Sequence, residues 1–242
     1  MKNISIWDEY SQKLKEDKKE IKNTTTDILI IGAGITGLTT AYFLKDINKK
    51  IIIIDKSIIG KGVTSKTTAK ISYIQQDIYQ KLTKIHNKDI AKKYYESQKE
   101  ATNIITKIIK DNKIACDLEK VNTILFANEE KNINKLNKEK TILSSYGVES
   151  KDYQDETIKH GFIVNNTYTF NPIKYLNAVK EIIKEKISIY ENTIATNIEK
   201  EDNYYLVTTN KGTIKTNKIV LACHYPFFIV PDFFPVKTYI ER

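Results

Sequence analysis

The sequence predicts an α/β protein with a doubly wound parallel sheet and an α+β domain inserted between its strands. Three observations indicate this fold. Regular structure begins with an apolar run at 28–31, a glycine-rich loop, a segment with helical spacing and a second apolar run at 51–54. Similar apolar runs return late in the chain, at 187–190 and 219–222. The long stretch between the early and late runs has mostly helical periodicity and supplies the inserted domain.

The first elements are a strand, a glycine-rich turn and a helix. Ile28–Ile31 is a short apolar run, typical of a strand that is buried on both faces. Gly32, Gly34 and Gly37 then fit the pattern G-x-G-x-x-G. In that pattern the glycines allow a tight turn, the close approach of a pyrophosphate and close packing of helix on strand. The helix N-terminus would offer N–H groups and partial positive charge to the phosphates.

The second strand ends in an acid. Ile51–Ile54 is followed by Asp55, which lies 18 residues after Gly37. An acid at this position accepts hydrogen bonds from the ribose hydroxyls of an adenosine. Strand, loop, helix, strand and acid therefore follow the order that dinucleotide binding requires. The alternative is a glycine-rich turn without a ligand.

The segment 56–70 is dense in hydroxyl groups, small residues and cations. Donors of these kinds suit an extended anionic cofactor lying along the loop. An ordinary polar surface loop explains the same composition equally well, so both interpretations stay open at this point.

The middle of the chain predicts helices and two strands. Residues 77–112 carry aliphatic and aromatic stripes at helical spacing, which indicate core packing rather than a ligand site. The elements expected next are strands at 114–118 and 122–127, a helix at 129–146 and an irregular stretch at 152–160.

The last third of the chain returns to the sheet. Asn171 and Pro172 open a helix at 173–186, with proline in the first turn as helix starts prefer. The strands expected after it are one at 187–190, a small antiparallel meander at 193–200, 204–209 and 212–216, and a returning buried strand at 219–222.

Composition narrows the class of protein. The net charge of +9 would suit nucleic acid, but lysines and acids alternate, as at 180–186, so no nucleic-acid partner is expected. Cys116 and Cys223 are isolated, which predicts neither a zinc site nor a disulfide framework. Because no apolar run is long enough to span a membrane and residues 1–23 lack a signal-peptide core, we expect a cytoplasmic protein.

Several motifs resemble the N-terminal part of the D-amino-acid-oxidase/glycine-oxidase-like FAD-dependent oxidoreductases. The resemblance rests on Ile31–Gly37, on Phe170–Leu176 and on Ile219–Pro226. Three further motifs are similar to a bacterial subgroup in which a Rieske iron–sulfur domain follows the oxidoreductase domain: Gly62–Ile71, Ile189–Thr193 and Tyr239–Arg242. This chain has no C-x-H…C-x-x-H pair, so a Rieske cluster is not expected in it.

The resemblance implies FAD as the cofactor and assigns residues to it. The implied pyrophosphate contacts are Gly32, Gly34, Ile35, Thr36 and Gly37. The implied adenosine ribose contacts are Asp55 and Lys56, and the adenine contact is the backbone of Ala195. The residues implied along the pyrophosphate and ribityl chain are Thr64, Ser65, Thr67, Thr68 and Ala69, with Ala222 and Cys223 beside the cofactor at the end of the returning strand.

The resemblance also implies a domain plan. An N-terminal arm at 1–23 precedes a discontinuous Rossmann-like FAD-binding domain at 24–75 and 165–225. A partial substrate domain comprises 76–164 and 226–242. The implied reaction takes a hydride from a C–H bond of an amine or amino acid to flavin N5. No catalytic acid or base and no metal ligand is assigned, and His224 after the returning strand is expected to be structural.

Three alternatives to an active single-chain FAD enzyme stay open. The first two arise because family members are longer than this chain. The first is a truncated, non-catalytic fragment, which would expose apolar surface around Phe227, Phe228, Phe233 and Phe234. The second is half of a two-chain flavoenzyme completed by a second polypeptide. The third is an NAD-dependent dehydrogenase with the same fingerprint, which the hydroxyl-rich segment and the inserted domain disfavour.

Overall fold

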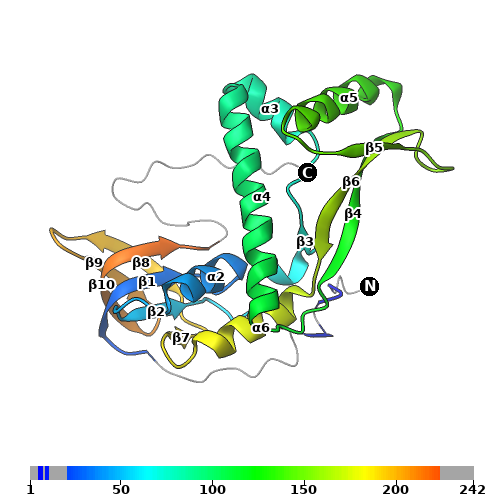
Figure 1. Cartoon of the computed structure of the whole chain (residues 1–242). Helices are drawn as coiled ribbons and strands as arrows, with labels where there is room; N and C mark the ends of the chain where they lie inside the picture. The colour runs from blue at the N-terminus through cyan, green and yellow to red at the C-terminus, as the bar shows by residue number, and fades with distance from the viewer. Residues whose placement is uncertain (1–4, 8, 11–20, 224–242) are drawn as a thin grey trace. The chain divides into compact units, whose positions relative to one another are not determined.

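The computed structural model describes residues 5–7, 9–10 and 21–223 (Figure 1). The chain forms two compact units. Unit 1 comprises Met1–Thr67 and Pro172–Arg242, and unit 2 comprises Thr68–Asn171. The discontinuity of unit 1 agrees with the predicted α/β fold with an inserted domain. Assigning unit 1 to the cofactor and unit 2 to a substrate stays a prediction, as do the bounds expected from the sequence.

Unit 1 contains a six-stranded sheet with the order β7-β2-β1-β10-β9-β8. The first four strands in that order are mutually parallel, and β9 and β8 are added in antiparallel pairing. This is the predicted parallel sheet with its meander. The strands are β1 (Thr24–Ile31), β2 (Ile51–Ile54), β7 (Ser188–Tyr190), β8 (Ala195–Lys200), β9 (Tyr205–Thr209) and β10 (Gly212–Leu221).

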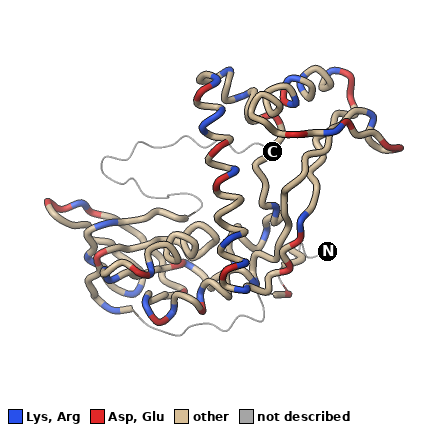
Figure 2. Tube along the Cα trace, viewed as in Figure 1, with Lys and Arg blue, Asp and Glu red and all other residues tan. Residues whose placement is uncertain are grey.

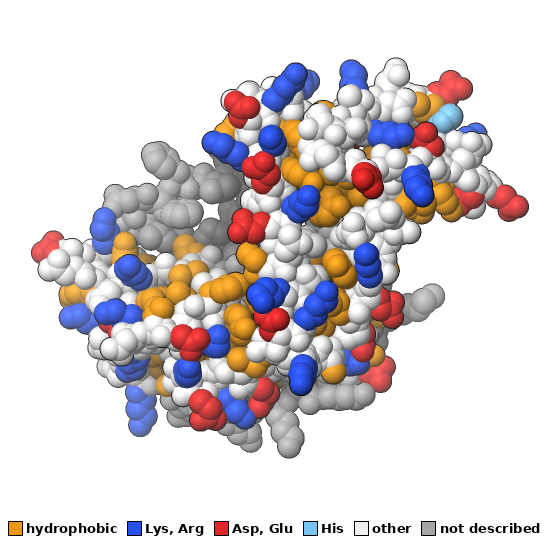
Figure 3. All heavy atoms as spheres, viewed as in Figure 1, with side chains coloured by type: hydrophobic (Ala, Val, Ile, Leu, Met, Phe, Trp, Pro, Cys, Tyr) orange, Lys and Arg blue, Asp and Glu red, His pale blue; other side chains and the backbone are white. Residues whose placement is uncertain are grey.

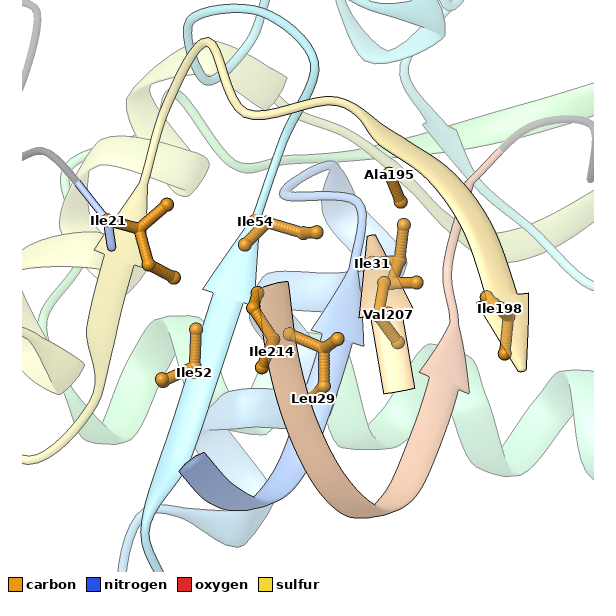
Figure 4. Close-up of a cluster of buried hydrophobic side chains, with 9 residues drawn as sticks. All are labelled: Ile21, Leu29, Ile31, Ile52, Ile54, Ala195, Ile198, Val207 and Ile214. Carbon is orange, nitrogen blue, oxygen red and sulfur yellow. The ribbon is translucent and has the colours of Figure 1, made fainter. Parts of the chain in front are cut away.

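Successive residues of a strand point to opposite sides of the sheet. The continuous apolar runs of β1 and β2 therefore make both faces of the sheet in unit 1 apolar. On one face, aliphatic side chains from five strands converge in a buried cluster (Figure 4). Alternate residues such as Ile30 and Ile53 are fully buried on the other face. The helix α2 (Ile35–Leu44) packs against β1 and against α6 (Pro172–Ile183). The runs of isoleucine therefore form strands that are buried on both faces, as predicted.

The expected break between strands at 212–216 and 219–222 is wrong. β10 is one continuous strand, Gly212–Leu221, and β1 pairs with it from Ile214 to Leu221. The polar residues Asn217 and Lys218 between the two expected strands are exposed, and Lys218 pairs with Ile28 in the ladder. Since β1 lies along this length of β10, the two segments cannot separate into different strands.

Unit 2 is an antiparallel sheet with three helices. β6 (His160–Thr169) is central and pairs with β4 (Glu119–Ala127), β3 (Lys70–Ile71) and β5 (Ser150–Tyr153). The helices are α3 (Ile78–Ile85), α4 (Lys88–Asp111) and α5 (Glu130–Ser145). Aromatic and aliphatic residues of these helices, of β6 and of the segments before α3 and after α5 form one buried cluster: Tyr73, Ile74, Tyr79, Tyr95, Leu143, Val148, Phe162 and Val164.

One expectation for unit 2 is wrong, and another is confirmed over most of its length. The stretch 114–118 is not a strand, because Asp117 has φ 53°, a left-handed conformation that an extended strand does not contain. The stretch 152–160, expected to be irregular, is irregular from 154 to 159, between the end of β5 at Tyr153 and the start of β6 at His160. The predicted helical region 77–112 is two helices, since the Asn87 side chain accepts a hydrogen bond from the Ile90 N–H and starts α4.

Charges are mixed along both units. Figure 2 shows acidic and basic residues interspersed along the chain trace, and Figure 3 shows the same mixture on the visible surface. Many lysines have an acidic partner, such as Lys135 with Asp77 at 2.7 Å. Within the part of the chain that the structure describes, no helix is long and apolar enough to cross a membrane.

Candidate cofactor site

Two glycines pack the loop between β1 and α2 against the end of β10. Gly32 has φ +113°, and a Cβ atom there would lie 2.6 Å from the carbonyl oxygen of Ala222. At Gly37 a Cβ atom would lie 1.8 Å from the carbonyl oxygen of Gly32. Real Cβ atoms do not approach other atoms so closely. The first and third glycines of the fingerprint are therefore required by the packing of the protein itself.

The second glycine has a different environment. Gly34 is the N-cap of α2, with φ −80° and ψ −168°, and a Cβ atom there would lie 3.1 Å from the hydroxyl oxygen of Thr64. That hydroxyl also accepts a hydrogen bond from the Ile35 N–H, at 3.3 Å. Gly34 supplies no side-chain cap, and the first turn, which includes the exposed Thr36, has no acid. Such a helix N-terminus suits a phosphate.

Asp55 joins the glycine loop to the segment after β2. Its Oδ2 accepts a hydrogen bond from the Ala33 N–H at 2.7 Å. Its Oδ1 accepts two, from the Ser57 N–H at 2.9 Å and from the Ser57 hydroxyl at 3.2 Å. Since each carboxylate oxygen has two lone pairs, Oδ2 retains an acceptor position for a ribose hydroxyl. The sequence predicted the acid, but it did not predict its contact with the loop.

Asp55 and Lys56 lie within electrostatic range of Cys223, which follows the end of β10. Ala222, the residue before Cys223, donates its N–H to the Ile31 carbonyl at 2.9 Å. Burial raises the pKa of the Cys223 thiol, and the Asp55 charge acts in the same direction, while the Lys56 ammonium opposes the shift. The thiol is therefore protonated at neutral pH and is a weak nucleophile.

Within the hydroxyl-rich segment, Thr64 and Ser65 have different roles. Both lie in the short 3₁₀ helix η1 (Val63–Lys66). Thr64 faces the start of α2, as described above. Ser65 is buried and donates its hydroxyl hydrogen bond to the Gly62 carbonyl at 2.9 Å, so this hydroxyl stabilises its own turn.

The rest of that segment crosses from unit 1 to unit 2. Thr67 closes unit 1, and its carbonyl accepts a hydrogen bond from Trp7 Nε1 at 2.8 Å. Thr68 and Ala69 begin unit 2. Ala69 has φ 55°, and its carbonyl accepts the Phe170 N–H at 3.3 Å. The assignment of Thr67, Thr68 and Ala69 to a cofactor stays a prediction.

Ala195 begins β8 and belongs to the same buried cluster as Ile31 and Ile54 (Figure 4). These isoleucines are the last residues of β1 and β2, where the glycine loop and Asp55 follow. Ala195 is therefore on the side of unit 1 that carries Asp55, and its predicted adenine contact stays a prediction.

Two further groups near Asp55 were not assigned to the site from the sequence. Ser57 supplies two of the hydrogen bonds that the Asp55 carboxylate accepts, and the signal for it is the short Asp-x-Ser spacing. Glu191, which follows β7, is buried with 1% of its surface exposed. Glutamate side chains usually lie at the surface, and no local sequence signal marks Glu191 as buried.

Other predictions concern metals and catalytic residues. Among residues 5–7, 9–10 and 21–223, no group of three or more His, Cys, Asp or Glu side chains could hold a metal ion. His224 and the four phenylalanines of the expected apolar surface lie outside the described residues.

The geometry fits the phosphate and ribose parts of a dinucleotide. Gly34 has an ordinary backbone conformation that an alanine could adopt, so its dihedral angles do not require glycine. The missing side chain instead leaves room for a pyrophosphate to approach the backbone. The start of α2, the Thr64 hydroxyl and the Asp55 carboxylate all belong to unit 1 and lie around this loop. Together they offer donors for a pyrophosphate and an acceptor for a ribose.

Comparison with known proteins gives the same class of ligand. Residues 27–240 match the family described as FAD dependent oxidoreductase (DAO). The chain is 30% identical over 226 residues to the putative Rieske 2Fe-2S iron-sulfur protein YhfW of Bacillus subtilis (strain 168), covering 91% of this chain and 44% of that protein. It is 23% identical over 217 residues to the probable oxidoreductase OrdL of Haemophilus influenzae, covering 85% and 50%. The chain thus spans about half the length of the curated relatives it matches.

Solved structures share the fold. L-amino acid deaminase from Proteus vulgaris superposes with a TM-score of 0.67 at 16% identity, over 86% of this chain and 49% of that one. Glycine oxidase from Bacillus cereus ATCC 14579 superposes with a TM-score of 0.63 at 18% identity, over 81% and 55%. At these identities the likeness establishes the architecture of the chain.

Proposed function

The chain belongs to the DAO family of FAD-dependent oxidoreductases, and we propose that it forms the FAD-binding part of an enzyme that oxidises an amine or amino acid. The proposal rests on one observation, the presence of glycine at position 34. Its φ and ψ angles permit a side chain, yet a glycine occupies this position, where the N-terminus of α2 meets the Thr64 hydroxyl.

Each part of the site has a role in holding FAD. The N–H groups of the first turn of α2 and the Thr64 hydroxyl would bind the pyrophosphate. Asp55 would accept a hydrogen bond from the adenosine ribose, with Lys56 beside it. Ala195 would contact the adenine through its backbone. The remaining residues proposed along the cofactor are Ser65, Thr67, Thr68, Ala69, Ala222 and Cys223.

Bound FAD supplies an acceptor, flavin N5, for a hydride from a substrate C–H bond. The residues of this chain bind the cofactor, fix its adenosine half and hold Cys223 as a neutral thiol near Asp55. The substrate class is supported by the proteins that share the fold, which include an L-amino acid deaminase and a glycine oxidase. A non-catalytic fragment and a two-chain enzyme stay as alternatives to an active single chain.

The first test is a visible absorbance spectrum of the purified chain, with the cofactor released by denaturation and identified by chromatography. We expect a flavin spectrum and released FAD. Bleaching of the flavin absorbance by an amine or amino acid would then support the proposed reaction. A folded, colourless chain that does not take up added FAD would refute the proposal. FAD uptake without bleaching by any substrate would favour the fragment or the two-chain enzyme.

A further inference from the structure

A buried acid lies beside the proposed adenosine site. Glu191 directly follows β7, and 1% of its surface is exposed. Its Oε1 accepts a hydrogen bond from the Ile59 N–H at 3.0 Å and lies 3.7 Å from Nζ of Lys180 on α6. The Lys180 side chain is 18% exposed. A buried carboxylate is strongly destabilising unless it is paired, so this arrangement requires both partners.

The turn that contains Glu191 holds the backbone of Asp55. The Asp55 N–H donates to the Tyr190 carbonyl at 3.0 Å, and the Thr193 N–H donates to the Asp55 carbonyl at 2.7 Å. The residues on either side of Glu191 therefore fix both backbone groups of Asp55. The Glu191 carbonyl in turn accepts hydrogen bonds from the Thr193 hydroxyl at 3.0 Å and from Lys211 Nζ at 3.2 Å.

The Glu191 side chain holds the other end of the same segment. Ile59, whose N–H it accepts, is buried and lies four residues after Asp55. Between them, Ser57 donates two hydrogen bonds to the Asp55 carboxylate, and its carbonyl accepts the Asn192 N–H at 3.4 Å. The segment 55–59 is thus fixed at its start by the backbone of the turn and at its end by the Glu191 carboxylate.

We propose that Glu191 and Lys180 are a positioning pair for the adenosine half of FAD. The proposal rests on the function proposed above and adds to it two residues that do not touch the cofactor. The Glu191 carboxylate holds Ile59, which keeps Ser57 against the Asp55 carboxylate and keeps Oδ2 of Asp55 directed at the glycine loop. Lys180 neutralises the buried charge. Without the pair, the segment 55–59 loosens and the ribose acceptor loses its orientation.

The test compares FAD and ADP binding, because ADP carries the adenosine half and pyrophosphate without the flavin. The variants are E191A, E191Q, K180M and the double variant E191Q/K180M. E181A is the matched control, since Glu181 lies on the same helix as Lys180 and forms an exposed pair with Lys184. Dissociation constants are measured at a temperature where circular dichroism shows each apoprotein to be fully folded, and apoprotein melting temperatures are recorded alongside.

We expect E191A to weaken FAD and ADP by the same factor, about tenfold, because the ribose loses its hydrogen bond to the misoriented Asp55 carboxylate, which is a hydrogen bond to a charged group. E191Q keeps an acceptor oxygen for Ile59 but leaves Lys180 unpaired, so it weakens both ligands less than E191A. E191Q/K180M removes the unpaired charge and restores affinity toward that of the unmodified chain. E181A leaves both constants unchanged.

Different failures identify different errors. If E191A, or E191Q where E191A does not fold, lowers the melting temperature but leaves ADP and FAD affinity unchanged, the pair is merely structural and the positioning proposal is overturned. The same conclusion follows if E191Q/K180M binds more weakly than E191Q. If the unmodified chain binds neither FAD nor ADP, the proposed function itself fails.

Discussion

Three glycines of this chain should respond differently to the same substitution by alanine. At Gly37 the new Cβ atom would lie 1.8 Å from a backbone oxygen, which cannot move without shifting the loop. Overpacking against rigid neighbours costs typically about 1–3 kcal/mol, and contact this close places G37A at about 3 kcal/mol or more. At Gly34 the nearest atom, at 3.1 Å, is a hydroxyl oxygen that can rotate away.

The expected stability of G34A is close to that of the unmodified chain. Its backbone angles suit alanine, and replacing glycine at such a position stabilises a protein by about 0.4–1 kcal/mol through the unfolded state. The contact with Thr64 offsets part of this gain. FAD affinity should nevertheless fall by at least about tenfold, or about 1.4 kcal/mol, because the Cβ atom occupies the approach to the backbone. Gly62 is the matched control, since a Cβ atom there meets nothing within 4 Å.

The assay combines urea unfolding, followed by circular dichroism, with titration of each apoprotein with FAD. We expect G37A to lose stability, G34A to keep stability and lose FAD affinity, and G62A to keep FAD affinity without losing stability. The reasoning would be refuted if G34A bound FAD as tightly as G62A. It would also be refuted if G34A and G37A lost stability by similar amounts, because the packing of the loop would then not distinguish the two glycines.

Three further predictions concern other parts of the chain. Burial raises the pKa of Glu139, so this side chain holds a proton more tightly in the native state than in the unfolded chain. The free energy of unfolding should therefore fall as pH rises from about 4.5 through the raised pKa. E139Q should flatten this part of the stability profile, measured by urea unfolding at each pH. The Tyr79 hydroxyl donates to the buried Tyr73 carbonyl, so Y79F should lower the free energy of unfolding by about 1–3 kcal/mol in a chemical denaturation series. Trp7, the one tryptophan of the sequence, donates to the Thr67 carbonyl, so W7F should cost about 0.5–1.5 kcal/mol in the same assay.

Each of these predictions has a contradicting result. An unchanged pH profile in E139Q would mean that another group titrates in that range. If Y79F were as stable as the unmodified chain, the Tyr73 carbonyl would have a second donor. Full stability in W7F would show that the arm contributes nothing to unit 1.

The parts of the fold that could be predicted are those whose signal is local. The first strand, the glycine turn, α2 and β2 lie within 24–54, and each has its own periodicity or turn chemistry. The central strand β6 was missed because its regular alternation is broken at Asn166, which has φ 66°, next to a register shift in its pairing with β4. A β-bulge of this kind removes the period of two on which strand prediction relies.

The site shows the same limit. The fingerprint glycines and Asp55 are recognisable because a known spacing relates them. Glu191 could not be recognised as buried, since its partners Lys180 and Ile59 lie on two other segments of the chain. The strand expected at 114–118 failed for a related reason: its apolar residues are buried by tertiary packing rather than by membership of a sheet.

The pairing of β1 with β10 has a consequence for synthesis of the chain. The Asn23 side chain accepts a hydrogen bond from the Thr213 N–H, 190 positions later in the sequence, and β1 pairs with β10 from this point onward. A ribosome releases β1 long before β10 exists, so one edge of that apolar strand lacks its neighbour during most of translation. Unit 2, in contrast, is contiguous from 68 to 171 and contains all the strands of its own sheet. The part of the protein that is translated first is therefore completed last.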